Sequence, residues 1–272
     1  MSVESGCGDC LSAEALSDQL GTRVVGRRIL VYPEVASTST MAVELAEQGE
    51  PEGTVVVAET QTAGRGRMGR HWDSVPHLGL WTSILLRPRV GPGEASLLSQ
   101  VAAVSLAEAI AEVEPAVAPQ IKWPNDLLLG ERKVAGILVE VKAEGDQVNY
   151  AVVGIGINCN HTLADFPAAL QPSATSLALV AGKPVSRLQV AQSLYRHLDA
   201  WYLRFAKGWR EPIVTRLSAL SGTLGRWVRV ETGREQYEAF AEAINQDGSL
   251  RVSLPGGEIR DLMSGEVSIR QG

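Results

Sequence analysis

The chain has 272 residues and a formal net charge of −6, with 45% apolar and 21% charged residues. This balance predicts a globular protein with one large domain, or a large and a small one, and excludes a disordered or fibrous chain. An acidic chain is a poor candidate for wholesale nucleic-acid binding. Since neither a signal peptide nor a bilayer-spanning apolar run is recognised, we expect a cytoplasmic protein with no membrane partner.

The first half of the chain is predicted to alternate strands with helices. Hydroxyl residues from Ser37 to Thr40 offer N-caps for one helix, which Gly49 would end. Segment 95–113 lacks glycine and proline and is rich in Ala, Leu and Val, so it predicts a buried helix. The other expected elements are a helix over 11–20, a strand over 27–32 ended by Pro33, and strands over 54–58 and 78–86.

The second half contains short apolar runs separated by turn residues, as in an antiparallel meander. These runs cover residues 121–123, 127–129, 134–141 and 148–157, and a long amphipathic helix is expected over 186–207. Strand blocks with long helices between them favour an α+β fold with a mixed or antiparallel sheet. From about residue 220 four short strands follow, over 227–230, 237–243, 250–254 and 259–262. We therefore expect a larger domain over 1–219, with 1–21 a flexible or short helical segment, and a small β-barrel over 220–272.

The segment Gly64–Arg70 alternates three glycines with three arginines directly after the strand predicted over 54–58. Glycine allows the backbone to approach a ligand closely, because it has no Cβ. Arginine supplies a planar, permanently charged fork that matches carboxylates and phosphates. A solvated connector with scattered charge is the alternative. The pattern favours a loop that wraps an anionic, phosphate-bearing ligand.

Three further segments carry candidate chemistry. In the run KWPND, Lys122 could contact phosphate and Asp126 could hold Mg²⁺ against nucleotide oxygens, although the run also fits an ordinary turn after a proline stop. In KVAGILVE, Gly136 would clear space beside a strand for a ligand. In GIGIN, Gly154 and Gly156 indicate either close approach of a ligand or a packing bulge.

The cysteines and histidines give little support for metal or redox chemistry. Cys7 and Cys10 have the spacing of a zinc or redox half-site, but the chain has no second pair. Cys159 follows an apolar run and is expected to be a buried filler. The four histidines show no metal-ligand spacing. We expect no histidine metal centre.

The motifs GRGRMGRHW, KWPND, KVAGILVE and GIGIN, in this order, resemble those of the catalytic domain of biotin protein ligases. The resemblance runs from about Ser37 to Asn158, and the small C-terminal β domain agrees with it. It implies a class II synthetase-like catalytic domain, in which a mixed or antiparallel sheet is combined with helices, followed by an SH3-like barrel. It also implies ATP-dependent, magnesium-assisted activation of biotin to biotinyl-AMP with release of pyrophosphate. Biotin would then pass to a lysine of the biotin carboxyl carrier protein of a carboxylase such as acetyl-CoA carboxylase.

The resemblance also assigns site residues. Biotin would be bound by Ser37, Thr38, Gln61, Gly64, Arg65, Arg67, Lys133 and Gly136. The nucleotide would be bound by Arg67, Arg70, Trp72, Lys122, Asn125, Asn158 and Arg270. The catalytic positive charges would be Arg67, Lys133 and Lys122, and Asp126 would hold the metal. One departure is Ser39, which stands where the family usually has asparagine.

Other functions fit parts of the same pattern. Some members of the family are also repressors with an N-terminal DNA-binding domain, but the stretch before Ser37 is short and not basic. We therefore expect a ligase without a DNA-binding head and no DNA partner, as a monomer or a homodimer. A non-catalytic biotin sensor and a lipoate or octanoate ligase of the same fold are the alternatives. The related lipoate ligases share the fold but lack the arginine–glycine loop.

Overall fold

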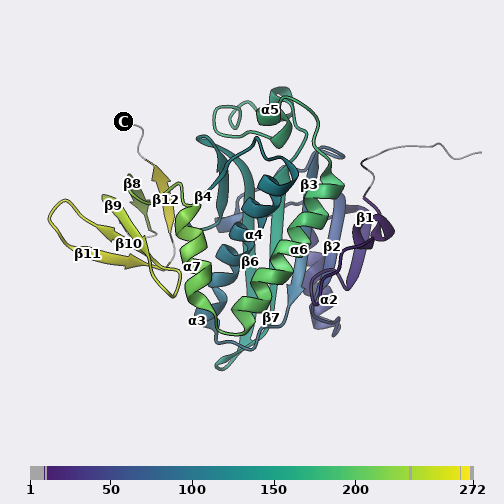
Figure 1. Ribbon diagram of the computed structural model, residues 1–272, viewed down its shortest axis with the longest axis horizontal. Coiled ribbons are helices and arrows are strands. Elements are labelled where there is room, and N and C mark those ends of the chain that lie inside the picture. Colours follow the sequence, from purple (N-terminus) through teal and green to yellow (C-terminus); the bar gives the residue numbers. More distant parts are fainter. Residues whose placement is uncertain (1–8, 10, 233–234, 264, 270–272) are drawn as a thin grey trace, which may run out of the picture.

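A computed structural model of the chain describes residue 9 and residues 11–232, 235–263 and 265–269. The expectations placed on Cys7, Cys10 and Arg270 lie outside the described residues. In the described part, two sheets lie side by side, a large one covered by helices and a smaller one at the C-terminal end (Figure 1).

The large sheet has seven strands in the order β1-β2-β3-β7-β6-β5-β4. Its strands are β1 (Arg28–Val35), β2 (Thr54–Gln61), β3 (Gly79–Leu86), β4 (Pro119–Lys122), β5 (Asp126–Leu129), β6 (Arg132–Glu144) and β7 (Gln147–Asn158). β1 runs parallel to β2, whereas every other neighbouring pair is antiparallel. The predicted mixed sheet in an α+β fold is confirmed.

The strand predicted over 27–32 extends further than expected, because Pro33 does not end it. Strand β1 runs on to Val35 and pairs only with β2. Pro33 is the residue of β1 that is skipped in the register with β2. An edge strand needs ladder hydrogen bonds on one side only, so it tolerates a residue that cannot donate.

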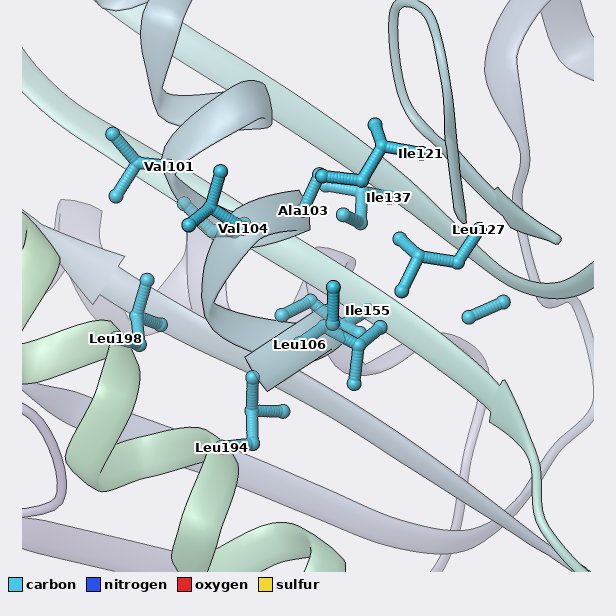
Figure 2. Packing of buried hydrophobic residues seen from close by; sticks show 14 of the residues in the cluster. Val101, Ala103, Val104, Leu106, Ile121, Leu127, Ile137, Ile155, Leu194 and Leu198 are labelled. Atoms are coloured by element: carbon cyan, nitrogen blue, oxygen red, sulfur yellow. The ribbon is translucent and has the colours of Figure 1, made fainter. Parts of the chain in front are cut away.

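Helices cover both faces of the large sheet. α4 (Leu97–Val113) and α6 (Arg187–Ala206) pack on one face, and α2 (Thr38–Glu47) packs on the other, against β2, β3 and β7. β2 shows the consequence, since Val55 and Val57 belong to the main core while Val56 packs under α2. Side chains of α4 such as Val104 and Leu106 lie between the sheet and Leu194 and Leu198 of α6 (Figure 2).

The helical run Pro92–Val113 is longer and more apolar than expected from the sequence. Among the described residues, the helical run Pro92–Val113 is long and apolar enough, by length and composition alone, to cross a membrane. In the fold, however, 67% of the 18-residue apolar window within that run is buried. Its central helix α4 packs between β4, β5, β6 and β7 on one side and α6 and α7 on the other. It therefore has the surroundings of a core helix.

Several short elements complete the fold. They are α1 (Ala13–Ser17), the 3-10 turns η1 (Arg67–Gly69) and η2 (Leu163–Asp165), α3 (Pro92–Ala95), α5 (Leu177–Ala181) and α7 (Arg210–Ala219). The helix predicted over 11–20 is shorter than expected and begins at the Ser12 cap, whose hydroxyl accepts from the Ala15 amide. α5 and α7 were not predicted.

The C-terminal part forms a five-stranded antiparallel sheet in the order β11-β10-β9-β8-β12. Its strands are β8 (Trp227–Glu231), β9 (Gln236–Ile244), β10 (Leu250–Ser253), β11 (Ile259–Leu262) and β12 (Glu266–Ile269). The small β domain is confirmed, but the predicted barrel is wrong in one respect. Among the described residues, β11 and β12 are opposite edges that do not pair, so the sheet is open. Its apolar side chains, such as Val228 and Val252, instead join the main core.

Candidate active site

Two adjoining cavities lie where the strand ends of the large sheet meet the Gly64–Arg70 loop. The larger has a volume of about 480 Å³, and the smaller is a narrow space of about 50 Å³ between α2 and the middle of β6 and β7. The same side chains and backbone line both spaces where they meet, namely Gly66, Arg67, Trp72, Asn125 and Lys133. A ligand in one cavity would therefore share its contacts with a ligand in the other.

The Gly64–Arg70 loop folds back on itself. Gly66 N donates to Arg70 O at 2.7 Å, and Trp72 N donates to Gly64 O at 2.9 Å. Met68 (φ +56) and Gly69 (φ +73) take the left-handed turn that reverses the chain. A side chain at Gly64 would meet the Trp72 carbonyl at 2.4 Å, so the closed base of the loop requires glycine there.

Arg67 points from this loop toward Asn125, which lies in the turn between β4 and β5. Its Nη1 donates to Asn125 Oδ1 at 2.7 Å, and its Nη2 reaches Gly265 O of the C-terminal sheet at 3.5 Å. Asn125 is 9% exposed, and its Nδ2 donates to Ile137 O on β6 at 2.9 Å. The amide thus fixes the guanidinium at the junction of the two cavities without neutralising its charge.

Lys133, at the start of β6, lies at the same junction. Its Nζ forms an ion pair with Asp126 Oδ1 at 2.7 Å, and lies 5.3 Å from the centre of the Trp72 ring. Both are contacts that a cation makes readily. Lys133 therefore stands between a carboxylate and an aromatic ring, facing the space that both cavities share.

The Trp72 ring rests on two glycines of neighbouring strands. A Cβ at Gly136 would lie 2.8 Å from the ring, and a Cβ at Gly156 would lie 2.7 Å from it. These two glycines face each other in the β6–β7 register. The glycines in KVAGILVE and GIGIN thus provide the flat surface on which this ring packs, and the ring forms a wall between the cavities.

Polar side chains form a chain at the closed end of the smaller cavity. Gln61 Oε1 accepts from Thr38 N at 2.8 Å and from Thr38 Oγ1 at 3.2 Å. Ser83 Oγ donates to Thr38 Oγ1 at 2.8 Å and lies 3.1 Å from Ser39 Oγ. Gln61 Nε2 also donates to Ser74 Oγ at 3.1 Å. Ser39, the departure from the family pattern, therefore completes a buried hydroxyl network.

An aromatic group forms the far wall of the larger cavity. His161 stacks on Phe166 with ring centres 5.1 Å apart, and meets Trp81 edge-on at 5.9 Å. Trp81 in turn contacts Trp72. Burial lowers the pKa of His161, although the nearby Asp165 carboxylate opposes the shift. A neutral imidazole beside an aromatic ring suits a flat, uncharged part of a ligand rather than a phosphate.

Most residues proposed from the sequence line these cavities. The smaller cavity is lined by Ser37, Thr38, Gln61, Arg65, Arg67, Lys133 and Gly136. The larger is lined by Arg67, Arg70, Trp72, Lys122, Asn125, Asp126, Lys133 and Asn158. Gly64, at the base of the loop, lines neither cavity. Arg65 forms an exposed ion pair with Glu140 at 2.7 Å.

Several lining residues were not predicted from the sequence. His161, Phe166 and Leu170 follow β7, and Arg226 and Ser268 come from the C-terminal part. His161 and Phe166 follow GIGIN closely in the sequence. Their proximity to that motif could have identified them as candidates for the cavity wall. No pattern pointed to Arg226 or Ser268, because their position depends on how the second sheet packs.

The acidic residues that the structure describes do not form a metal cluster of their own. Within the described residues, no group of three or more His, Cys, Asp or Glu side chains converges on one point. Four acidic residues line the larger cavity, namely Asp73, Asp126, Glu131 and Asp165, and the Asp126 side chain is 20% exposed. One such carboxylate is enough for Mg²⁺, which is usually held by one or two carboxylates while water and substrate phosphates complete its shell.

Comparisons with known proteins show which family the sequence and the fold are similar to. The sequence profile of the biotin/lipoate A/B protein ligase family matches residues 31–158, and that of the biotin protein ligase C-terminal domain matches residues 223–270. A bifunctional ligase/repressor of Bacillus subtilis is 35% identical over 259 residues, covering 95% of this chain and 79% of the relative. A biotin–[acetyl-CoA-carboxylase] ligase of Mycobacterium tuberculosis is 31% identical, covering 94% and 95%. A biotin protein ligase of Aquifex aeolicus, solved in complex with biotin and ATP, has a TM-score of 0.76 at 29% identity, covering 90% and 100%.

Proposed function

The chain belongs to the biotin protein ligase family, and from this premise we propose how its two cavities divide the reaction. It is a biotin–[acetyl-CoA-carboxylase] ligase that uses biotin and ATP. The smaller cavity receives biotin and the larger receives ATP. One observation carries this assignment: the spaces join at Arg67 and Lys133, where the carboxylate of one substrate and the α-phosphate of the other must meet.

In the first half-reaction, a carboxylate oxygen of biotin attacks the α-phosphorus of ATP. The bond to the β-phosphate oxygen breaks, and pyrophosphate leaves with the electron pair. Two anions must approach each other, so fixed positive charge at the junction lowers the barrier. Arg67 and Lys133 supply that charge at the shared wall, and Lys122 adds to it from the larger cavity.

The hydrogen-bond network at the closed end of the smaller cavity would hold the polar ring of biotin. Ser37, Thr38 and Gln61 all line this space and present hydroxyl and amide groups. Gly136 would border the ligand indirectly, because its missing side chain leaves the room beside β6 that the Trp72 ring and Lys133 occupy. In the larger cavity, Trp72, Asn125 and Asn158 would contact the nucleotide, and Arg70 and Arg65 would help the loop to close.

In the second half-reaction, a lysine amine of a biotin carboxyl carrier protein attacks the carbonyl carbon of the mixed anhydride. The bond to the phosphate oxygen breaks, AMP leaves and the amine loses its proton. A loop that covers the adenylate excludes water and slows its escape. No covalent enzyme intermediate is needed, and a stoichiometric adduct on denatured, turning-over enzyme would contradict this scheme.

Mg²⁺ is the metal that fits the single carboxylate of Asp126. When bound, it would neutralise phosphate charge and favour departure of pyrophosphate. Asp126 would hold it, and the ion pair with Lys133 would orient the carboxylate. The residues up to 219 would form the catalytic domain and those from 220 the second domain, and the reaction would take place in the cytoplasm.

Pyrophosphate exchange into ATP tests this function, with biotin, lipoate or octanoate as the added acid. Exchange that requires biotin is expected. Exchange with lipoate or octanoate instead would move the chain to the other branch of the family. Biotin binding without exchange would make it a sensor that retains the fold without the chemistry.

A further inference from the structure

Arg226 lines the larger cavity from the C-terminal part of the chain, although it lies far from the four motifs in sequence. It precedes strand β8 and shares the cavity wall with Lys122 of β4 and Ser268 of β12. Arg226 and Ser268 thus bring a charge and a hydroxyl into a cavity whose other described walls come from the catalytic part.

Hydrogen bonds to the KWPND segment fix the position of the chain just before Arg226. Ile121 N donates to Leu220 O at 2.8 Å, and Gly222 N donates to Ile121 O at 2.9 Å. Trp123 N donates to Thr223 Oγ1 at 3.0 Å. These bonds hold the segment before Arg226 against the residues that flank Lys122, so both cations come from neighbouring backbone.

A second contact fixes the small sheet itself. The carbonyl of Gly248 accepts from Gln100 Nε2 of α4 at 2.6 Å and from Trp123 Nε1 at 3.0 Å. Trp123 is 2% exposed and Gln100 is 5% exposed. Breaking buried hydrogen bonds of this kind would destabilise the fold, because it leaves polar groups without partners. The small sheet and the large domain are therefore held in one arrangement.

Lys122 and Arg226 line the larger cavity without a direct partner for their charge within the described part of the chain. Lys133 is paired with Asp126, and Arg67 is held by the neutral Asn125. Among the described residues, the side chains of Lys122 and Arg226 form no hydrogen bond or ion pair, although Asp73, Asp126, Glu131 and Asp165 line the same cavity. Two cations that face a cavity without an anionic partner favour an anionic ligand there.

Lys122 and Arg226 occupy a different part of the site from Arg67 and Lys133. Arg67 and Lys133 line both cavities, whereas Lys122 and Arg226 line only the larger one. The α-phosphate must sit at the junction, so the phosphates beyond it extend into the larger cavity. The aromatic wall at His161 and Phe166 suits the uncharged base, which leaves the Lys122–Arg226 side for the charged end.

We propose that Arg226, beside Lys122, binds the β- and γ-phosphates of ATP and the pyrophosphate that leaves. This inference rests on the proposed function and deepens it. As the bond between the α-phosphorus and the bridging oxygen breaks, the electron pair departs with pyrophosphate, and negative charge grows there. A guanidinium supplies paired N–H donors for that charge. The biotinyl-AMP left behind lacks these phosphates, so it makes no contact with Arg226.

The test compares Arg226→Ala and Arg226→Lys with the wild type in three reactions. These are adenylate formation with ATP varied, the reverse formation of ATP from biotinyl-AMP with pyrophosphate varied, and biotin transfer from purified biotinyl-AMP to a carrier domain. The matched control is Arg251→Ala, which removes a cation from the same sheet, where Arg251 pairs with Asp261 on the exposed surface. Thermal melting of each variant checks folding.

For Arg226→Ala, the KM values for ATP and pyrophosphate should each rise about tenfold or more, as expected for loss of a charged hydrogen bond. Transfer from purified biotinyl-AMP should stay within about twofold, and Arg226→Lys should recover part of the loss. Arg251→Ala should match the wild type in all three reactions.

Two results would overturn the inference while leaving the function intact. Unchanged KM values for ATP and pyrophosphate would exclude a phosphate contact, and an equal loss in all three reactions would indicate a structural or adenylate-binding role. If the wild type itself shows no biotin-dependent pyrophosphate exchange, the proposed function fails instead. Binding of inorganic pyrophosphate to the free enzyme, weakened by Arg226→Lys in a folded variant, would support the same assignment without turnover.

Discussion

Asn125 holds Arg67 at the junction of the two cavities through a hydrogen bond of 2.7 Å between Arg67 Nη1 and Asn125 Oδ1. The two residues lie 58 positions apart, one in the glycine–arginine loop and one in KWPND. The loop is therefore joined to the wall that it covers. Since Asn125 is itself fixed to the Ile137 carbonyl, the position of the loop depends on the strands beneath it.

Arg67→Gly should release biotinyl-AMP faster, because the loop loses both its bond to Asn125 and its contact with the adenylate phosphate. We expect release to rise about tenfold or more, as for loss of a charged hydrogen bond, with biotin appearing on lysines of bystander proteins. Release is measured with labelled adenylate in a trap experiment. Asn125→Ala should have a smaller effect of the same kind, and the double variant should not add the two effects. Full additivity would contradict the coupling.

Gly156→Ala should impair biotin binding through the Trp72 ring. The new Cβ would lie 2.7 Å from the ring, so Trp72 must shift toward the smaller cavity or away from Lys133. We expect the KM for biotin to rise about tenfold, with folding retained. Gly93→Ala is the control, because nothing lies within 4 Å of its Cβ. Equal KM values for the Gly156→Ala variant and the wild type would show that Trp72 is not a wall of the biotin site.

The sequence predicted the main elements of the large sheet, and most of the site residues that it proposed line the cavities. The reason is that these residues lie in short motifs whose glycines and cations have a local physical meaning. Arg67 and Lys133 carry charges that suit the binding of carboxylates and phosphates. Gly136 and Gly156 interrupt runs of strand-forming residues, which marks a close approach to the sheet.

What the sequence could not predict depends on packing between distant segments. Arg226 precedes a strand in an ordinary charged pattern, and its place in the cavity follows from hydrogen bonds such as that of Trp123 with Thr223. Helix α7 alternates charged and apolar residues weakly, so its periodicity gave no clear signal. The open form of the C-terminal sheet also depends on packing between distant segments. Its apolar face is covered by the rest of the chain, so the sheet does not need to close on itself.

Arg187→Met should destabilise the fold strongly. The guanidinium is 1% exposed and pairs with Glu59 at 2.6 Å and Asp9 at 2.8 Å, while it also donates to Gly79 O. Removing the guanidinium leaves the Asp9 and Glu59 carboxylates without their shared cation. We expect the free energy of unfolding to fall by about 3 kcal/mol. Urea denaturation measures it, and Arg251→Met, which breaks an exposed pair, should cost much less. Equal losses would contradict this view.

His161 should make the protein less stable as the pH falls below neutrality. Burial lowers the pKa of this imidazole in the folded state, with Asp165 opposing the shift, so the unfolded chain takes up a proton at a higher pH than the folded one. Where the unfolded state binds more protons, the free energy of unfolding rises with pH, and it is lost as the pH drops through the ordinary histidine pKa of about 6.5. Urea denaturation at pH 7.5 and about pH 5.5 should show the loss. His161→Phe, which keeps the stacking on Phe166, should lose about 1 kcal/mol less than the wild type over that interval. Identical losses would show that His161 is protonated equally in both states.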